Sequence, residues 1–233
     1  MKAQEVSYKR SLVIGMLLGD ANSRKRNRLG GVHSVCFTVT HSQSQADLVE
    51  WKAAQMAKCY AVNINVHHRV YEYSRHSTFS FTQRKRLRVI HDWFHRDGRK
   101  TISEKVKFMD HPVGLAMLLC DDGSIRKRKK QHRDGTLYFM SPSITVATHC
   151  FSREEVLLLL DHIKRVCGAE GYINPERRVR RGSEVVYNRI NFNAENSKVL
   201  WDYVSAWIPR VPSMMKKFEF IIERYGLNET ADA

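Results

Sequence analysis

The sequence predicts an α/β (α+β) protein built from two similar halves, each with the element order αββαββα and an antiparallel sheet. An apolar helical run that ends in an acid occurs twice, in residues 11–22 and 111–124. Alternating strands and amphipathic helices follow each run in the same order. Because this shared order indicates an internal duplication, we expect an N-terminal half at residues 1–104 and a C-terminal half at residues 105–233.

The first apolar run begins at Ser11 and includes Gly15 and Gly19, which are four residues apart. Residues at this spacing share one face of a helix. Glycine inside a helix costs roughly 1 kcal/mol relative to alanine, and two glycines on one face indicate that another backbone comes close. The run ends at Asp20, where a carboxylate opposes the helix dipole and a bound cation would relieve the repulsion.

The second run starts at Pro112, a residue that suits a first helical turn, and ends at Asp122. Its small residues four apart are Ala116 and Cys120, through which we expect this helix to pack. If the two helices pack face to face, Asp20 and Asp122 lie side by side. Two carboxylates in one place repel each other unless a divalent metal or a proton lies between them.

In the N-terminal half, hydrophobic alternation and turn residues predict two hairpins among three helices. Gly30-Gly31 marks the turn of the first hairpin. The expected elements are a helix ending near Asp20, a hairpin over residues 21–41, a helix over 45–60, a hairpin with strands near 62–67 and 79–84, and a helix over 87–94.

In the C-terminal half, Ser152 and Glu155 have the spacing of a helix capping box, and Asp134-Gly135 is typical of a turn. The expected elements are strands through residues 137–139 and 144–147, a helix over 152–167, a hairpin over 172–193, and helices over 197–207 and 213–225.

The two motifs, Gly15-Met-Leu-Leu-Gly-Asp20-Ala and Ala116-Met-Leu-Leu-Cys-Asp-Asp122-Gly, resemble those of single-chain LAGLIDADG homing endonucleases. The nearest branch is the yeast mitochondrial intron type, with LLGDA in the first motif and MDDG in the second. The resemblance covers residues 8–225. Ala21 replaces the usual glycine after the first acid, and Met117 and Asp121 stand where the first helix has glycines. The resemblance assigns the catalytic position to Asp122, and Asp121 is the alternative acid.

The composition limits the partners and the compartment. The chain has 233 residues and a formal net charge of +15, which favours a polyanionic partner. Its five cysteines show no CxxC spacing and indicate reduced thiols. No apolar run approaches the roughly 20 residues that span a bilayer, and no signal peptide follows Met1. We therefore expect an intracellular protein without a membrane partner, in a compartment that the sequence leaves open.

The polar positions of the two predicted sheets carry side chains suited to double-stranded DNA. β-ribbons fit the major groove, where Arg pairs with guanine and Asn with adenine, and Arg and Lys clusters contact phosphates. Two such sheets side by side would form a concave saddle. The residues expected to contact DNA are Arg24, Arg26, Thr38, Thr40, Asn63, Asn65, His67, Ser80, Thr82, Arg84, Arg126, Arg128, Arg178, Arg180, Arg189, Asn191 and Asn193.

The resemblance implies hydrolysis of one phosphodiester on each strand of a long asymmetric DNA site by a monomer. It implies cleavage across the minor groove with short 3′ overhangs, and a role in intron or intein mobility. Asp20 and Asp122 would be catalytic metal ligands for Mg²⁺, with Mn²⁺ as a substitute and Ca²⁺ as an ion that binds without supporting cleavage. Whether two or three ions bind stays open.

Two lysines complete the expected catalytic set by resemblance. Lys100 matches the lysine ahead of the second motif, and Lys217 matches its equivalent in the second half. A cation near the scissile phosphate stabilises charge in the transition state. Arg99 and Lys216 are neighbouring rivals.

Other functions stay open at this point. The same fold serves RNA maturases that bind intron RNA, and catalytically silent DNA-binding proteins; the presence of both motif acids argues against a silent protein. His67-His68, and His91 with His95, have no third ligand at metal-binding spacing. The sequence therefore disfavours a zinc or HNH nuclease.

Overall fold

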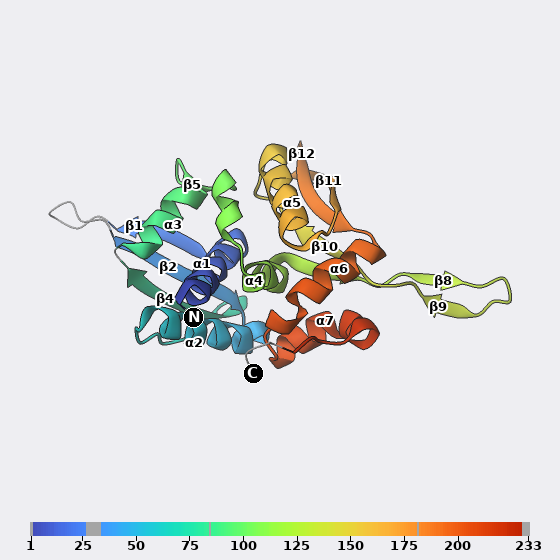
Figure 1. Cartoon of the computed structure of the whole chain (residues 1–233), viewed down its shortest axis with the longest axis horizontal. Coiled ribbons are helices and arrows are strands. Elements are labelled where there is room, and N and C mark those ends of the chain that lie inside the picture. Colours follow the sequence, from blue (N-terminus) through green and yellow to red (C-terminus); the bar gives the residue numbers. More distant parts are fainter. Residues whose placement is uncertain (1, 27–33, 84, 181, 230–233) are drawn as a thin grey trace.

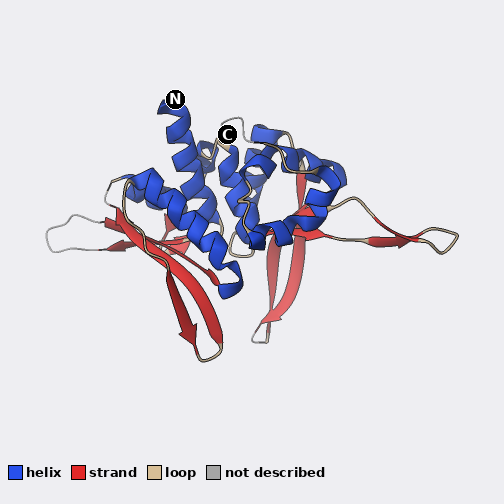
Figure 2. Cartoon of the chain, turned by 90° about the horizontal axis from the view of Figure 1, so that it is seen from below, coloured by secondary structure: helices blue, strands red, loops and turns tan. Residues whose placement is uncertain are grey.

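The computed structural model of the chain contains two four-stranded antiparallel sheets with helices on one side of both (Figures 1 and 2). The structure describes residues 2–26, 34–83, 85–180 and 182–229. The expected turn at Gly30-Gly31, and Arg84, lie outside the described residues.

The element order repeats along the chain. The N-terminal half contains α1 (Lys2–Leu18), β1 (Asn22–Arg26), β2 (Ser34–Ser42), η1 (Gln43–Gln45), α2 (Ala46–Tyr60), β3 (His67–Tyr71), β4 (Ser74–Gln83), α3 (Arg86–Phe94), β5 (His95–Arg96) and β6 (Arg99–Lys100), and η2 (Glu104–Phe108) leads from it into α4. The C-terminal half contains α4 (Pro112–Asp122), β7 (Gly123–Arg126), β8 (Lys129–Gln131), β9 (Leu137–Phe139), β10 (Ser143–Ala147), α5 (Arg153–Cys167), β11 (Gly171–Arg180), β12 (Ser183–Phe192), α6 (Ala194–Val204), η3 (Ser205–Trp207) and α7 (Pro212–Tyr225).

The two sheets share one topology. Their strand orders are β1-β2-β4-β3 and, from the equivalent edge, β7-β10-β12-β11. In each sheet the residue two positions after the motif acid pairs with a threonine, Asn22 with Thr38 and Ser124 with Thr145. These equivalent pairs align the halves and confirm the predicted fold class. The division after residue 104 stays a prediction.

The helices α1 and α4 pack against each other at the centre of the molecule, where their apolar runs are buried (Figure 1). A Cβ atom on Gly15 would lie 2.7 Å from the carbonyl carbon and 2.8 Å from the Cα of Gly114. The close backbone approach expected at Gly15 is therefore present. Its partner is Gly114, which the sequence analysis did not select; Ala116 and Cys120 are buried nearby in the same helix.

Ser152 and Asn193 both cap helices, but only Ser152 was predicted to do so. The capping box is confirmed: Ser152 Oγ accepts from the Glu155 N–H at 3.3 Å, and Glu155 Oε2 accepts from the Ser152 N–H at 2.6 Å. Asn193, expected on the DNA-contacting sheet face, instead follows the last residue of β12 and caps α6, its Oδ1 accepting from the Asn196 N–H at 2.8 Å. Its side chain serves the helix, so its selection as a strand residue was wrong.

The second predicted hairpin begins later than expected. β3 starts at His67, which pairs with Thr78, and residues 62–66 have no strand partner in the described structure. Val62, Ile64 and Val66 are partly buried against the core, which explains their alternation with polar residues. Asn63 and Asn65 are exposed, but they lie in the segment that leads into β3 and not in a strand.

A narrow hairpin formed by β8 and β9 projects away from both sheets (Figure 1). The predicted turn at Asp134-Gly135 is present, with Gly135 at φ +88° and the Thr136 N–H donating to Asp134 Oδ1 at 2.9 Å. The hairpin is exposed along both strands. No helix among the described residues is both long enough and apolar enough to cross a membrane.

Candidate active site

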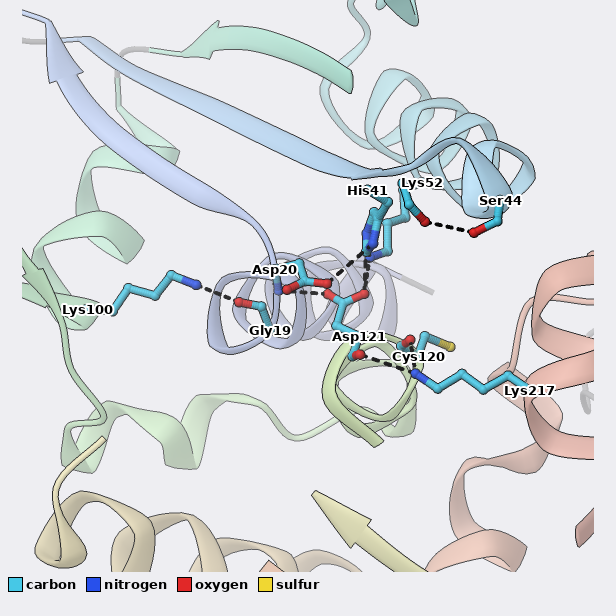
Figure 3. Close-up of polar contacts among 10 residues, drawn as sticks. Gly19, Asp20, His41, Ser44, Lys52, Lys100, Cys120, Asp121 and Lys217 are labelled. Atoms are coloured by element: carbon cyan, nitrogen blue, oxygen red, sulfur yellow. Dashed lines mark hydrogen bonds and ion pairs between the residues drawn. The ribbon is translucent and has the colours of Figure 1, made fainter. Parts of the chain in front are cut away.

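Three acids lie where α1 and α4 end, and Figure 3 shows two of them, Asp20 and Asp121. Asp20 lies just beyond the end of α1, and Asp121 and Asp122 are the last residues of α4. The acid in direct contact with Asp20 is Asp121, whose Oδ2 accepts from the Asp20 N–H at 3.1 Å. A Cβ on Gly19 would lie 2.6 Å from the Asp121 Cβ, so the second small residue of α1 leaves the space that this acid fills.

Asp121 belongs to a buried polar network with Lys52 and His41. Lys52 Nζ forms an ion pair with Asp121 Oδ1, and neither side chain is exposed. Lys52 Nζ also lies 3.0 Å from His41 Nε2, and His41 Nδ1 lies 3.3 Å from Asp20 Oδ2. Burial lowers the pKa of His41, as does the charge of Lys52, whereas the two acids oppose this shift.

Neither Lys52 nor His41 was predicted from the sequence to belong to the site. Lys52 occupies a buried position of α2, in register with Leu48 and Met56. A lysine at such an apolar position was the available signal, because lysine is almost never fully buried without a partner. The partner lies 69 residues away along the chain, which the pattern of α2 does not reveal.

Asp122 is held differently from its neighbour. Its side chain is half-buried and makes no hydrogen bond or ion pair with the part of the chain that the structure describes. Burial raises the pKa of Asp122 to about 7, and the charges of Asp20 and Asp121 add to the shift, while Lys100 and Lys217 oppose it. An ionised carboxylate here is costly without an additional cation.

The two predicted lysines approach the acids from opposite sides (Figure 3). Lys100 Nζ donates to the Gly19 carbonyl at 2.5 Å, and Lys217 Nζ donates to the carbonyls of Cys120 at 2.5 Å and Asp121 at 3.2 Å. Each lysine therefore binds the carbonyl of the residue directly before a motif acid. Burial lowers the pKa of both lysines, and nearby acids oppose the shift.

Lys100 and Lys217 lie in different kinds of secondary structure. Lys100 lies in the short β5–β6 hairpin, whose turn residues Asp97 and Gly98 have φ values of 51° and 76°, as a type I′ turn requires. Lys217 lies in α7. The rivals point elsewhere: Arg99 pairs with Glu155 at 3.0 Å, and Lys216 is exposed.

Two sets of donors here have the chemistry of a metal site. Ligand atoms of Asp20, His41 and Asp121 all lie within 4.8 Å of one another. The Lys52 ammonium already compensates Asp121, so that set needs no ion. Asp20 with Asp122 fits a hard divalent cation better, because both offer oxygen and Asp122 has no cationic partner in direct contact within the described residues.

The N-terminal sheet presents its polar side chains next to Asp20. A hollow is lined by Asp20, Asn22, Arg24, Arg26, Cys36, Thr38 and Thr40. Of the residues predicted to contact DNA here, Thr38 is half-buried and the others described on the strands are exposed: Arg24, Arg26, Thr40, His67, Ser80 and Thr82. This exposed face leads directly to one of the motif acids.

On the C-terminal sheet, an acid pairs with two of the residues predicted to contact DNA. Glu176 accepts from Arg178 Nε at 2.6 Å and pairs with Arg189, so these two arginines are engaged within the protein. Asn191 is only 3% exposed, because it lies in β12 between Thr145 and Tyr172 of the flanking strands. The prediction that Asn191 contacts DNA from an exposed position was therefore wrong.

Three predicted DNA contacts in this half remain: Arg126, Arg128 and Arg180. Arg126 at the end of β7 and Arg128 before β8 are exposed. Arg180 ends β11, and its side chain is outside the described part of the structure.

Comparison with known proteins agrees with this arrangement. The model of the LAGLIDADG DNA endonuclease family matches residues 10–200. The chain therefore belongs to the LAGLIDADG DNA endonuclease family, a family of DNA nucleases. Its two-sheet fold is that of the LAGLIDADG homing endonucleases.

Solved structures show the same fold at low sequence identity. The homing endonuclease I-WcaI bound to its DNA recognition sequence matches with a TM-score of 0.61 and 15% identity, over 91% of this chain and 85% of that one. I-DmoI in complex with DNA and Ca matches with a TM-score of 0.53 and 9% identity, over 91% and 97% of the two chains.

Two curated relatives match about half of the chain. Protein RecA of Mycobacterium shimoidei is 33% identical over 128 residues, which are 52% of this chain and 28% of that protein. Protein RecA of Mycolicibacterium chitae is 30% identical over 123 residues, or 51% and 26%. The matched segments thus span about a quarter of the length of these relatives.

Proposed function

We propose that this protein is a site-specific homing endonuclease that breaks both strands of a long asymmetric DNA site by Mg²⁺-dependent phosphodiester hydrolysis. The observation that carries the proposal is the placement of Asp20 and Asp122 at the ends of two packed helices, with a lysine bonded to the backbone before each acid. One chain supplies both acids and both sheets, so a monomer suffices. Because the halves differ in sequence, the site need not be palindromic.

Each residue of the site has a chemical role. Asp20 and Asp122 would hold the cation; once bound, it would supply a Lewis acid and an activated water. Lys100 and Lys217 place ammonium groups beside the acids, where they would neutralise charge that develops on the phosphate. We propose that Mn²⁺ substitutes for Mg²⁺ and that Ca²⁺ binds without supporting cleavage.

DNA would lie along the sheet faces that the helices leave open (Figure 2). The net charge of +15 favours phosphate contacts, and the exposed arginines and threonines beside Asp20 favour base reading on the N-terminal sheet. On the C-terminal sheet, Arg178 and Arg189 would have to exchange Glu176 for DNA. We expect that sheet to contribute less base contact per residue.

We further propose that an intervening element of the intron or intein type encodes the protein. The support is the match to a segment of RecA proteins that is only about a quarter of their length, as expected for an endonuclease unit carried inside a host. The corresponding site of action is intracellular DNA.

A cleavage selection tests the function. The protein is incubated with Mg²⁺ and a plasmid library of genomic fragments, and the cut ends are sequenced. The Asp20→Asn/Asp122→Asn variant should bind DNA but leave it uncut, whereas the control Asp161→Asn, which changes an exposed acid of α5, should cut like the unmodified protein.

One recurrent long site, cut only when both motif acids are present, would establish the endonuclease. Tight retention of RNA or DNA without cleavage would contradict the proposal and favour a maturase or a silent binder. Cleavage by the double acid variant would contradict the assigned roles of the acids.

A further inference from the structure

The ion pair between Lys52 and Asp121 has no counterpart in the other half of the duplication. Lys52 is the seventh residue of α2, and the seventh residue of α5, a helix of the same length, is Leu159. Asp121 directly precedes its motif acid, and the equivalent position before Asp20 is Gly19. One half thus has a buried charge pair where the other has a leucine and a glycine.

Stability alone does not explain this pair. Both side chains are fully buried, and removing two charges from water costs free energy that their attraction often only balances. An apolar pair of similar volume is frequently as stable or more stable. Since the leucine and glycine of the other half show that the fold works without the charges, the pair calls for another role.

The two motif acids differ in how their backbones are held. At the end of α1, the Gly19 N–H bonds to Gly15 O at 3.1 Å and the Ala21 N–H bonds to Met16 O at 2.9 Å. The Asp20 N–H between them instead donates to the Asp121 carboxylate. Asp122, in contrast, is the last residue of α4 and is held by its own helix. Only Asp20 depends on a side chain from the other half.

We propose that Asp121, fixed by Lys52, is a positioning residue for Asp20, so that the two halves hold their motif acids by unequal means. Lys52 fixes one carboxylate oxygen of Asp121 and leaves the other to accept the Asp20 N–H. Cleavage of one DNA strand then depends on the pair more than cleavage of the other strand does. The strand effect rests on the proposed function; the backbone contact does not.

The variant Lys52→Leu/Asp121→Gly gives both positions the residues found in the other half. Because it buries no unpaired charge, we expect it to fold, unlike either single variant. In NMR spectra without DNA, the Asp20 amide should move upfield and exchange with solvent at least about tenfold faster, while the Asp122 amide stays unchanged. An unchanged shift and exchange rate at Asp20 would overturn the positioning role.

Single-turnover cleavage of a supercoiled plasmid carrying the selected site gives the second readout. Misplacing one acid should slow one strand at least about tenfold, so nicked circles should accumulate with the Leu/Gly variant. The control Lys52→Met/Asp121→Asn removes both charges but keeps an amide oxygen for the Asp20 N–H, and it should linearise the plasmid with the normal strand ratio.

The outcomes separate the two proposals. An unchanged strand ratio in the Leu/Gly variant, or equal slowing of both strands, would overturn the inference. Nicked circles with the Met/Asn control as well would show that the charge, and not the acceptor oxygen, matters, which also overturns it. If the unmodified protein cuts no DNA, the proposed function fails, while the Asp20 amide still decides the positioning role.

Discussion

Replacing Gly15 with alanine should both destabilise the protein and separate its motif acids. The added Cβ would lie 2.7 and 2.8 Å from two backbone carbons of Gly114. Nonbonded carbon atoms normally pack about 3.5–4.0 Å apart, so α1 and α4 would have to separate by about 1 Å. A backbone cannot rotate away as a side chain can, and the displacement would therefore reach the helix ends at Asp20 and Asp122.

The expected loss follows from two opposing terms. Overpacking of a tight core costs about 1–3 kcal/mol. The upper end applies here because the added Cβ clashes with backbone atoms of Gly114 and not with a side chain. Alanine has a better helix propensity than glycine, and this offsets about 1 kcal/mol of the loss in stability. A net loss of about 2 kcal/mol lowers the Tm of a chain of this size by about 4–8 °C. Since misplacement by about 1 Å can cost about 100-fold in rate, cleavage at 25 °C should fall further than the folded fraction does.

The measurements are urea unfolding, calorimetry and single-turnover cleavage at 25 °C. Gly114→Ala is the matched control, because its Cβ would mainly meet the flexible side chain of Met109, with Ser11 O at 2.9 Å. The control should lose less stability than Gly15→Ala. A Gly15→Ala protein as stable as the original, or more stable than Gly114→Ala, would refute the reasoning about the helix contact.

Three further predictions use the charges of the site and the core. Folding raises the pKa of Asp122 from 3.8 to about 7, so its charged form opposes folding as pH rises through this range. Asp122→Asn should therefore raise the metal-free unfolding free energy at pH 8 by up to about 4 kcal/mol, with little gain at pH 4; urea titrations at both pH values check this. Burial lowers the pKa of His162 from 6.5 to about 4, so stability should be complete above pH 6.5 and fall by up to about 3 kcal/mol as pH drops through 4; a His162→Gln protein whose Tm falls just as steeply would contradict this. Lys100→Met or Lys217→Met should lower the single-turnover cleavage rate about 100-fold with little change in DNA affinity, and loss of affinity alone would assign these lysines to general phosphate binding.

The fold was predictable because its strongest signals are local and occur twice. The apolar runs before Asp20 and Asp122, and the capping box at Ser152, each depend on residues close together in sequence. Their repetition in one order was enough to predict the two sheets. Alternation was less reliable, because it reports burial and not strand pairing. Residues 62–66 alternate because they pack on the core from an unpaired segment.

Polar residues were harder to place, since their type does not say what they bind. Asparagine reads adenine in a groove but also caps helices, and Asn193 does the latter. Arginine contacts phosphate or guanine but also pairs within the protein, as Arg189 does with Glu176. The partner of Arg189 comes from a neighbouring strand, a contact of which a single sequence carries no direct signal. Asn193 instead caps the helix that begins at the next residue, so alternation extended the strand over a residue that belongs to the helix end.

The adjacent acids Asp121 and Asp122 at the end of α4 differ in their surroundings, which bears on which of them is the better candidate for a metal ligand. Consecutive residues of a helix point about 100° apart, so Asp121 and Asp122 cannot face the same partners. Asp121 faces the end of α1 and is satisfied by Lys52 and the Asp20 N–H. Asp122 is left with charged neighbours but no direct partner among the described residues. An acid already bound to a lysine gains little from a metal, whereas an unpaired acid beside another carboxylate gains most. The electrostatics thus favour Asp122 over its neighbour for the proposed role of metal ligand, in agreement with the motif alignment.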